Sequence, residues 1–262
     1  MGTSVRVFFN SFKYGVTMKI TKTELDLTTP DGEMALIIAR PDDDKPRPAI
    51  LVIMEAFGVD PHIISITERF AEAGFIAVTP DLFHRSGRLR YAPYDKLQEM
   101  REELRQGFSD NSIDSDIQET VNFLQSNGSV NGRIGIVGFC LGGRISMQAA
   151  IRVKGLSGAA IFYGGNMFPS EEQSEVFSAY TEAPHLNIPL VGFFGMQDQN
   201  PSVNQIQKLE NMLINLRKDY NFYYYENAGH GFFCNDRESY RPDAARDSWE
   251  KTLDFFKLHC PL

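Results

Sequence analysis

The heptapeptide GFCLGGR (Gly138–Arg144) joins two stretches of different pattern. The apolar run RIGIV (133–137) precedes it, and the stretch RISMQAAIRV (144–153), which has helical spacing, follows it. A strand that turns into a helix through Gly-x-nucleophile-x-Gly is a nucleophile elbow, which holds one side chain on a sharp turn at the edge of a parallel sheet. We therefore predict that Cys140 is a nucleophile; the alternative is an inert thiol in a glycine-rich turn.

The rest of the chain has the pattern expected around such a turn. Residues 18–27 and 33–40 alternate in polarity on either side of TTPDG, which predicts an antiparallel hairpin. Apolar runs then alternate with helical patterns, which predicts an α/β fold with a mostly parallel, doubly wound sheet and helices on both faces. The predicted strands are 49–54, 75–79, 133–137, 158–163, 190–194 and 221–225, and the predicted helices are 62–74, 113–124, the stretch after Cys140, 204–218 and 243–259.

The composition limits the classes of partner. The chain has 262 residues, 42% of them hydrophobic, and a formal net charge of −8, so we expect it to repel nucleic acid and anionic membrane surfaces. No apolar run approaches the roughly 18 residues of a membrane helix. Three cysteines without metal-binding spacing predict neither a disulfide framework nor a structural zinc site, and we expect a cytoplasmic protein.

The organisation is predicted to be simple. We expect residues 1–17 to be an N-terminal extension that is poorly ordered, and residues 18–262 to form a single domain, because no repeat or low-complexity linker interrupts them. The segments 81–112 and 164–188 are long polar connections. Such connections gather at the carboxyl ends of parallel strands, so we expect these two to form a lid or the walls of a pocket.

Two further residues follow predicted strands and complete a catalytic set with Cys140. Asp198 follows LVGFFGMQ and His230 follows NFYYYENAG, which is the order nucleophile, acid, histidine. His230 would carry the thiol proton, Asp198 would orient the imidazole, and the backbone N–H of Leu141 would face the developing oxyanion. The alternatives are that Asp198 caps the following helix and that His230 is a structural histidine.

Five short motifs in the expected order resemble those of the dienelactone hydrolase (carboxymethylenebutenolidase) family, a cysteine-nucleophile branch of the α/β-hydrolases. They are MEAFG (54–58), TPDLFHR (79–85), GFCLGG (138–143), GMQD (195–198) and AGHGF (228–232). The resemblance extends over nearly the whole chain from about residue 18. It implies an α/β-hydrolase fold and a lactone or ester as the small-molecule substrate.

The resemblance also implies roles for three residues. Glu55 would lie beside the thiol and keep it protonated until substrate displaces the carboxylate, which like-charge repulsion makes reasonable. The N–H of Ala56 would be the second oxyanion donor, and Arg85 would bind a substrate carboxylate. The alternatives are that Glu55 is a solvated charge at a strand end and that Arg85 is a solvated loop residue.

The chain departs from the family at one position. Members specific for dienelactone have a second arginine four residues after the catalytic histidine, where this chain has Cys234. We expect Arg237, or else Arg241, to reach the pocket in its place. Cys234 and Cys260 are expected to be inert, and the other histidines to be surface or structural residues; these are His62, His84, His185 and His259.

The sequence therefore predicts a hydrolase that opens a lactone or cleaves an activated ester through a thioester on Cys140. We expect no metal or organic cofactor, and a monomer or small homo-oligomer. Two alternatives stay open: a general carboxylesterase or thioesterase for neutral substrates, and a ligand-binding protein of the same fold without catalytic activity.

Overall fold

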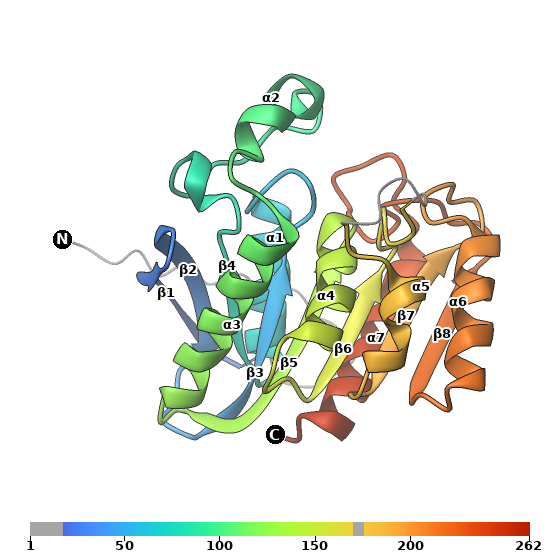
Figure 1. Cartoon of the computed structure of the whole chain (residues 1–262). Helices are drawn as coiled ribbons and strands as arrows, with labels where there is room; N and C mark the ends of the chain where they lie inside the picture. The colour runs from blue at the N-terminus through green and yellow to red at the C-terminus, as the bar shows by residue number, and fades with distance from the viewer. Residues whose placement is uncertain (1–17, 170–175) are drawn as a thin grey trace.

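A single twisted sheet organises the molecule (Figure 1). The computed structural model describes residues 18–169 and 176–262, and within these residues the sheet has eight strands in the order β1-β2-β4-β3-β5-β6-β7-β8. β1 and β2 pair antiparallel, as does β2 with β4, and the other neighbours are parallel. The strands are β1 Ile20–Thr29, β2 Gly32–Pro41, β3 Arg47–Ile53, β4 Ile76–Pro80, β5 Val130–Phe139, β6 Gly158–Phe162, β7 Leu190–Gly195 and β8 Tyr220–Tyr225.

The helices form two layers around this sheet. α1 and α7 cover one face and contact each other through the rings of Phe70 and Trp249, whose centroids lie 4.6 Å apart. α3, α4, α5 and α6 cover the other face, and none of the helices in the described part of the chain is long and apolar enough to cross a membrane. The helices are α1 Pro61–Glu72, α2 Leu97–Leu104, α3 Asp110–Ser126, α4 Leu141–Arg152, α5 Ala179–Glu182, α6 Val203–Asn215 and α7 Pro242–His259, with 3₁₀ turns η1 His84–Ser86 and η3 Ala183–His185.

The burial of the strands explains the sequence pattern. Every residue of β3 is buried, as are the last six of β5, because helices cover both faces of the central sheet. β1 lies at the edge of the sheet, and most of its residues are exposed or half-buried. The predicted doubly wound sheet with its N-terminal hairpin is confirmed.

The long connections lie at the carboxyl ends of the strands, and they contain the structure that the sequence did not predict. The connection 81–112 carries α2, which projects beyond that edge of the sheet (Figure 1). The connection 164–188 carries α5 and η3. The predicted N-terminal extension 1–17 and residues 170–175 of the second connection lie outside the described residues.

Candidate active site

The turn at Cys140 has the strained backbone of a nucleophile elbow. Cys140 has φ 55° and ψ −113°, a conformation that a residue with a side chain rarely adopts, and α4 begins at the next residue. Its N–H donates to the carbonyl of Phe162, and its carbonyl accepts from the N–H of Gly165, at 3.0 and 3.2 Å. These bonds to the end of β6 hold the thiol in one place above the sheet.

Two glycines make this turn possible. A Cβ on Gly138 would lie 2.0 Å from the carbonyl oxygen of Gly142, and a Cβ on Gly142 would lie 2.4 Å from the carbonyl oxygen of Ile53. The first glycine allows the helix to fold back onto β5, and the second allows it to approach the end of β3. The GFCLGG motif is therefore explained by close backbone contacts.

His230 and Asp198 meet at the same edge of the sheet. Asp198 follows β7 and is buried, and His230 follows β8. The His230 Nδ1 and Asp198 Oδ2 atoms lie 2.8 Å apart, and the other oxygen of Asp198 accepts the N–H of Asn200. Asp198 is not a helix cap, because Ser202 caps α6 with a hydrogen bond from the N–H of Gln205.

The charge state of His230 depends on its two neighbours. Burial lowers the pKa of the imidazole, but its interactions with Asp198 and Cys140 outweigh burial and raise the pKa to about 10. The three residues therefore form one electrostatic unit.

A small cavity of about 180 Å³ brings the predicted oxyanion donors to this unit. Its lining includes Cys140, His230, Ala56 and Leu141. Ala56 lies in the loop after β3, which is the parallel neighbour of β5, and Leu141 is the first residue of α4. The first N–H groups of a helix have no acceptor within that helix, so they are available to an anion in the cavity.

Glu55 and Arg237 form an ion pair behind this cavity. The Glu55 carboxyl is fully buried, with Oε2 3.4 Å from Arg237 Nη1 and with no hydrogen-bond partner for Oε1 among the described residues. Burial raises the pKa of Glu55, although Arg237 opposes this. Arg237 lies against the ring of Phe57 and does not line the cavity, so its charge is directed to Glu55.

The dienelactone hydrolase family model matches residues 34–260, which is most of the chain. The chain belongs to the dienelactone hydrolase family. A protein of Yersinia pestis named “Putative carboxymethylenebutenolidase” is 29% identical over 90% of this chain and 88% of its own, and one of the same name from Methylorubrum extorquens is 30% identical over 90% and 80%.

A solved structure supports the same relationship. A “Putative Dienelactone Hydrolase” of Klebsiella pneumoniae superposes with a TM-score of 0.82 and is 27% identical, over 91% of this chain and 98% of that one. Family and relatives together make this dienelactone hydrolase family member a carboxylic ester hydrolase. The alternative of a ligand-binding protein without catalytic activity is set aside.

Arg85, in the TPDLFHR motif, is not among the residues that line the cavity beside Cys140. It donates to Asp116 at 2.7 Å and to Asp31 at 2.6 Å. Asp116 of α3 is buried, and a buried carboxylate without a cationic partner would be strongly destabilising, so it engages Arg85. Asp31 and Asp116 hold the Arg85 guanidinium in this structure, and the contact of Arg85 with a substrate carboxylate stays a prediction. Arg241 likewise donates to backbone carbonyls outside the cavities.

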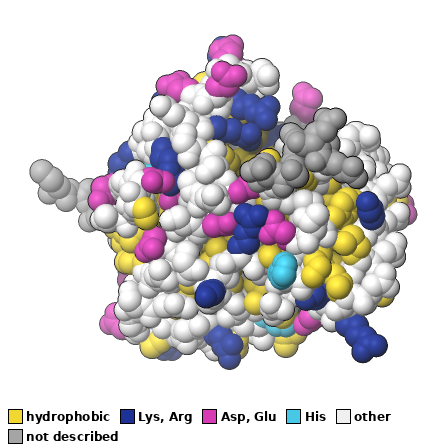
Figure 2. Space-filling view, viewed as in Figure 1, with side chains coloured by type: hydrophobic (Ala, Val, Ile, Leu, Met, Phe, Trp, Pro, Cys, Tyr) yellow, Lys and Arg dark blue, Asp and Glu magenta, His cyan; other side chains and the backbone are white. Residues whose placement is uncertain are grey.

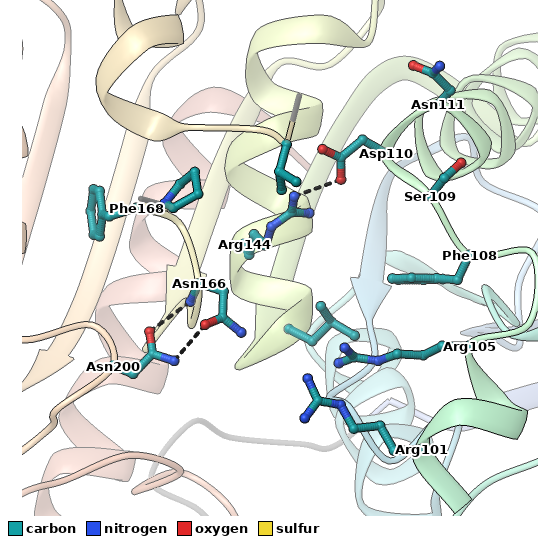
Figure 3. Close-up of a pocket in the computed structure, with 13 residues that line it drawn as sticks. Arg101, Arg105, Phe108, Ser109, Asp110, Asn111, Arg144, Asn166, Phe168 and Asn200 are labelled. Carbon is teal, nitrogen blue, oxygen red and sulfur yellow. Dashed lines mark hydrogen bonds and ion pairs between the residues drawn. The ribbon is translucent and has the colours of Figure 1, made fainter. Parts of the chain in front are cut away.

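Two arginines that the sequence analysis missed line the cavity instead. Arg101 of α2 and Arg105, which ends that helix, contribute to the wall beside Cys140. They also line an adjoining cavity of about 620 Å³, which shares Leu141 with the first (Figure 3). A signal was present, because two arginines four residues apart stand in a connection predicted to be a pocket wall.

The remaining histidines and cysteines lie away from the two cavities. In the described part of the chain, His62, Cys234 and Asp236 form the group that could hold a metal ion, with ligand atoms within 4.8 Å of one another. His62 is buried and its pKa is lowered, with burial as the largest cause, which fits the structural role predicted for it. Burial raises the pKa of Cys234 to about 11 and that of Cys260 to about 12.

The other three histidines differ in burial. The His84 side chain is buried with Nε2 3.4 Å from Asp116, beside the Arg85 ion pair, which fits a structural role. His185 is exposed at the end of η3, and His259 is half-buried at the end of α7. Neither lies in the wall of the cavity beside Cys140.

Proposed function

We propose that this ester hydrolase opens a lactone or cleaves an activated ester through a thioester on Cys140. The observation that carries the proposal is the 2.8 Å contact between His230 and Asp198, with His230 on the wall of the cavity that contains Cys140. A nucleophile, an acid and a histidine, in this order along the chain, are the members of a catalytic triad.

In the first step, the Cys140 sulfur attacks the carbonyl carbon of the ester. His230 holds the proton that the thiol loses, and Asp198 stabilises the resulting imidazolium. The carbonyl oxygen becomes an oxyanion, which the N–H groups of Ala56 and Leu141 stabilise. The carbon–oxygen bond to the leaving group then breaks, and the leaving oxygen takes the proton from His230.

In the second step, water replaces the leaving group. Neutral His230 takes a proton from water, which adds to the thioester carbonyl, and the carbon–sulfur bond breaks. The products are the carboxylic acid and Cys140 in its starting state. Because a thiolate is itself a good leaving group, this chemistry favours substrates whose other leaving group is a stabilised enolate over amides.

Glu55 is proposed to restrain the resting thiol. A carboxylate near a thiol disfavours the thiolate, so Glu55 would protect Cys140 from oxidation until substrate arrives. Arg237 stands 3.4 Å from the carboxylate and is its ion-pair partner in this structure. We do not assign Arg237 a direct contact with substrate.

The test is to trap the thioester. The enzyme is mixed with 4-nitrophenyl acetate, quenched in acid and digested, and we expect one acetyl group on the peptide that contains Cys140. Cys140→Ser should give an acetyl ester that alkali removes and hydroxylamine at neutral pH removes slowly, whereas the thioester is removed quickly. Cys260→Ala is the control, since Cys260 is a buried thiol that is no part of the site. Unmodified Cys140 during turnover would refute the mechanism.

A second candidate is a carboxylesterase or thioesterase for neutral substrates. The ion pairs of Arg85 with Asp31 and Asp116 favour this candidate, because they engage the arginine that was expected to bind a substrate carboxylate. The cationic wall formed by Arg101 and Arg105 weighs against it. The predicted cytoplasmic location, the independence of cofactors and the oligomeric state stay predictions.

A further inference from the structure

His62, Cys234 and Asp236 come together where α1 begins and the loop before α7 passes it. His62 is the second residue of α1, and the other two lie in the loop between β8 and α7 that also carries His230. One ligand atom from each of the three lies within 4.8 Å of the other two. None of them lines the cavity beside Cys140, so the group is separate from the proposed catalytic residues.

The three side chains are of the kinds that bind zinc. A thiolate sulfur, an imidazole nitrogen and a carboxylate oxygen are its usual protein ligands, at roughly 2.0 to 2.3 Å from the ion. Two ligand atoms of a tetrahedral ion then lie about 3.3 to 3.6 Å apart, so the present separations have to shorten by no more than about 1.5 Å. Asp236 is exposed, and its carboxylate is free to turn toward the other two. Calcium and magnesium prefer oxygen ligands, so the thiol and the imidazole favour zinc over them.

His62 has no hydrogen-bond partner for either of its ring nitrogens. The residue is 4% exposed, and neither Nδ1 nor Nε2 bonds to a described residue. Buried polar groups of native proteins are nearly always hydrogen-bonded, so two unpartnered nitrogens on one buried ring require an explanation. A metal ion bound to one of the nitrogens would provide a partner for it.

A second set of groups holds the sulfur of Cys234 in place. The Tyr94 hydroxyl lies 3.3 Å from Cys234 Sγ and 3.0 Å from Asp60 Oδ2. Asp60 in turn caps α1, because its other carboxylate oxygen accepts the N–H of Ile63 at 2.9 Å. Hydrogen bonds behind the ligands orient them in zinc sites. This chain of contacts fixes the sulfur beside the first turn of α1.

The charges around the group suit an ion with two anionic ligands. On the face that Figure 2 displays, acidic and basic side chains lie next to one another at several places. Asp236, in contrast, is an exposed carboxylate without an ion pair among the described residues. The guanidinium of Arg69 lies over the rings of Phe233 and Trp249 and acts on His62. A zinc ion with a thiolate and a carboxylate has no net charge, so Arg69 does not repel the occupied site.

We propose that His62, Cys234 and Asp236 bind a zinc ion, with water as the fourth ligand, and that the ion fastens the loop of His230 to α1. On binding, a sulfur–zinc bond replaces the S–H bond of Cys234, and the proton passes to solvent. The exposed side of Asp236 is the entry for the ion. The sequence has no zinc-binding spacing because His62 and Cys234 meet only in the folded chain. The site is structural and goes beyond the proposed function, since it contributes no group to the hydrolysis.

The position of the site connects it to the loop that carries His230. The Cys234 N–H donates to the carbonyl of Gly231, and the Cys234 carbonyl accepts the N–H of Arg237, both at 3.2 Å. Cys234 therefore lies in the middle of a turn that begins beside His230 and ends at Arg237, the ion-pair partner of Glu55. An ion that joins this turn to α1 requires the folded chain, so it stabilises the folded state.

The experiment uses Co²⁺ as a spectroscopic probe, because it occupies zinc sites and gives a sulfur-to-cobalt charge-transfer band only with a thiolate ligand. Cys140→Ala is the background, which removes the thiol of the catalytic cavity, and the protein is first freed of metal under reducing conditions. We expect one Co²⁺ per chain with this band, and displacement by zinc with a Kd of about 10 µM or below. Adding Cys234→Ala should abolish the band, whereas adding Cys260→Ala, which removes a buried thiol elsewhere, should keep it.

Two further variants in the same background test the other ligands. His62→Gln and Asp236→Asn should each weaken zinc binding by about tenfold or more, since each removes one of three protein ligands. Glu238→Gln is the matched control for Asp236, because it removes an exposed carboxylate from the same loop, and it should leave the Kd unchanged. In the otherwise unaltered chain, zinc at about 100 times its Kd should raise Tm by about 5 °C, and this gain should be lost in Cys234→Ala.

Three outcomes would overturn the zinc site. They are the absence of the charge-transfer band, a band that persists without Cys234, and a zinc Kd above about 10 µM. Any of them would leave buried water as the partner of His62. If His62→Gln does not fold, Cys234→Ala and the exposed substitution Asp236→Asn decide. Because the readout is metal binding, the result does not depend on whether Cys140 hydrolyses esters.

Discussion

Arg85 and Arg105 stand near the two ends of the connection 81–112 and have opposite surroundings. Arg85 lies between two carboxylates, one of which, Asp116, is buried. Arg105 lies in a cavity wall with a buried donor that has no acceptor among the described residues. The same side chain is a structural cation in one place and a free cation beside a nucleophile in the other. The two arginines differ in whether the fold places an acidic side chain beside them.

This difference shows why a motif does not by itself assign a binding role. TPDLFHR carries the arginine that the family resemblance linked to substrate, yet Asp116 comes from α3, 31 residues further along the chain, and engages it. No motif drew attention to Arg105. Its position follows from the placement of α2, which ends at Arg105 and lies over the carboxyl edge of the sheet.

The largest effect is expected for Cys140. The contrast between Arg85 and Arg105 matters for catalysis only if the cavity that Arg105 lines contains the nucleophile. Cys140→Ala should lower kcat for 4-nitrophenyl butyrate by at least about a thousandfold without unfolding the protein, since alanine is small and the turn depends on its glycines. Steady-state kinetics and circular dichroism check this. Retention of more than about a tenth of the wild-type kcat would place the chemistry elsewhere.

The next largest effect is expected for Asp198, the carboxylate that pairs with His230. Asp198→Asn should lower kcat about 100- to 10,000-fold, because the amide no longer stabilises the imidazolium. The pKa of His230 is raised from 6.5 to about 10, so its interactions stabilise the fold below pH 6.5, and this contribution is lost as the pH rises through 10. The loss of Tm in the variant should therefore be larger at pH 6 than above pH 10. An equal loss at both pH values would contradict the assigned charge state.

The direct way to break the comparison is to remove the paired arginine. Arg85→Ala removes the arginine partner of buried Asp116 and leaves His84 as its ion-pair neighbour among the described residues, so we expect a loss of about 3 kcal/mol in the free energy of unfolding. The ratio of the kcat/KM values for mono-4-nitrophenyl succinate, which is charged, and 4-nitrophenyl butyrate, which is neutral, should stay near that of wild type. Denaturant unfolding and the two kinetic assays measure both quantities. A selective loss of the charged substrate would restore the role that the family motif implied for Arg85.

The smallest effect is expected at Glu55. Burial raises its pKa above 4.5, so the carboxylate destabilises the fold at neutral pH and stops doing so as the pH falls below 4.5, where it is protonated in both states. Glu55→Gln should therefore raise the free energy of unfolding at pH 7 to 8 and change it little at pH 4. Thermal unfolding at these pH values measures the difference. A lower Tm at every pH would mean that the ion pair with Arg237 outweighs burial.

Alkylation tests the second role of Glu55. If repulsion from the carboxylate restrains Cys140, iodoacetamide should react faster with Glu55→Gln than with wild type at neutral pH. Arg88→Gln serves as the control, since it changes a charge far from the thiol in an exposed ion pair. Equal rates from pH 6 to 9 would mean that Glu55 does not act on the thiol.

Much of the fold could be predicted because its signals are local. Buried strands such as β3 read as continuous apolar runs, and α1 and α7 carry apolar residues at helical spacing. α2 was missed because only one of its eight residues, Leu104, is buried, so it has almost no apolar face to reveal it. The short α5 was missed for want of length. Both lie in connections, where tertiary packing outweighs pattern.

The sequence by itself determined the strands, the glycine turn at Cys140 and the order of Cys140, Asp198 and His230, because backbone conformation and burial periodicity are properties of neighbouring residues. Only the tertiary structure decided which charges meet. Arg85 pairs with Asp116, and Arg237 pairs with Glu55, across elements that are distant in the chain. The buried donor of Arg105 lacks a partner among the described residues for the same reason: what surrounds it is set by helices and loops from elsewhere in the chain. Electrostatic interactions act between side chains that are close in space, and a linear pattern does not record that proximity.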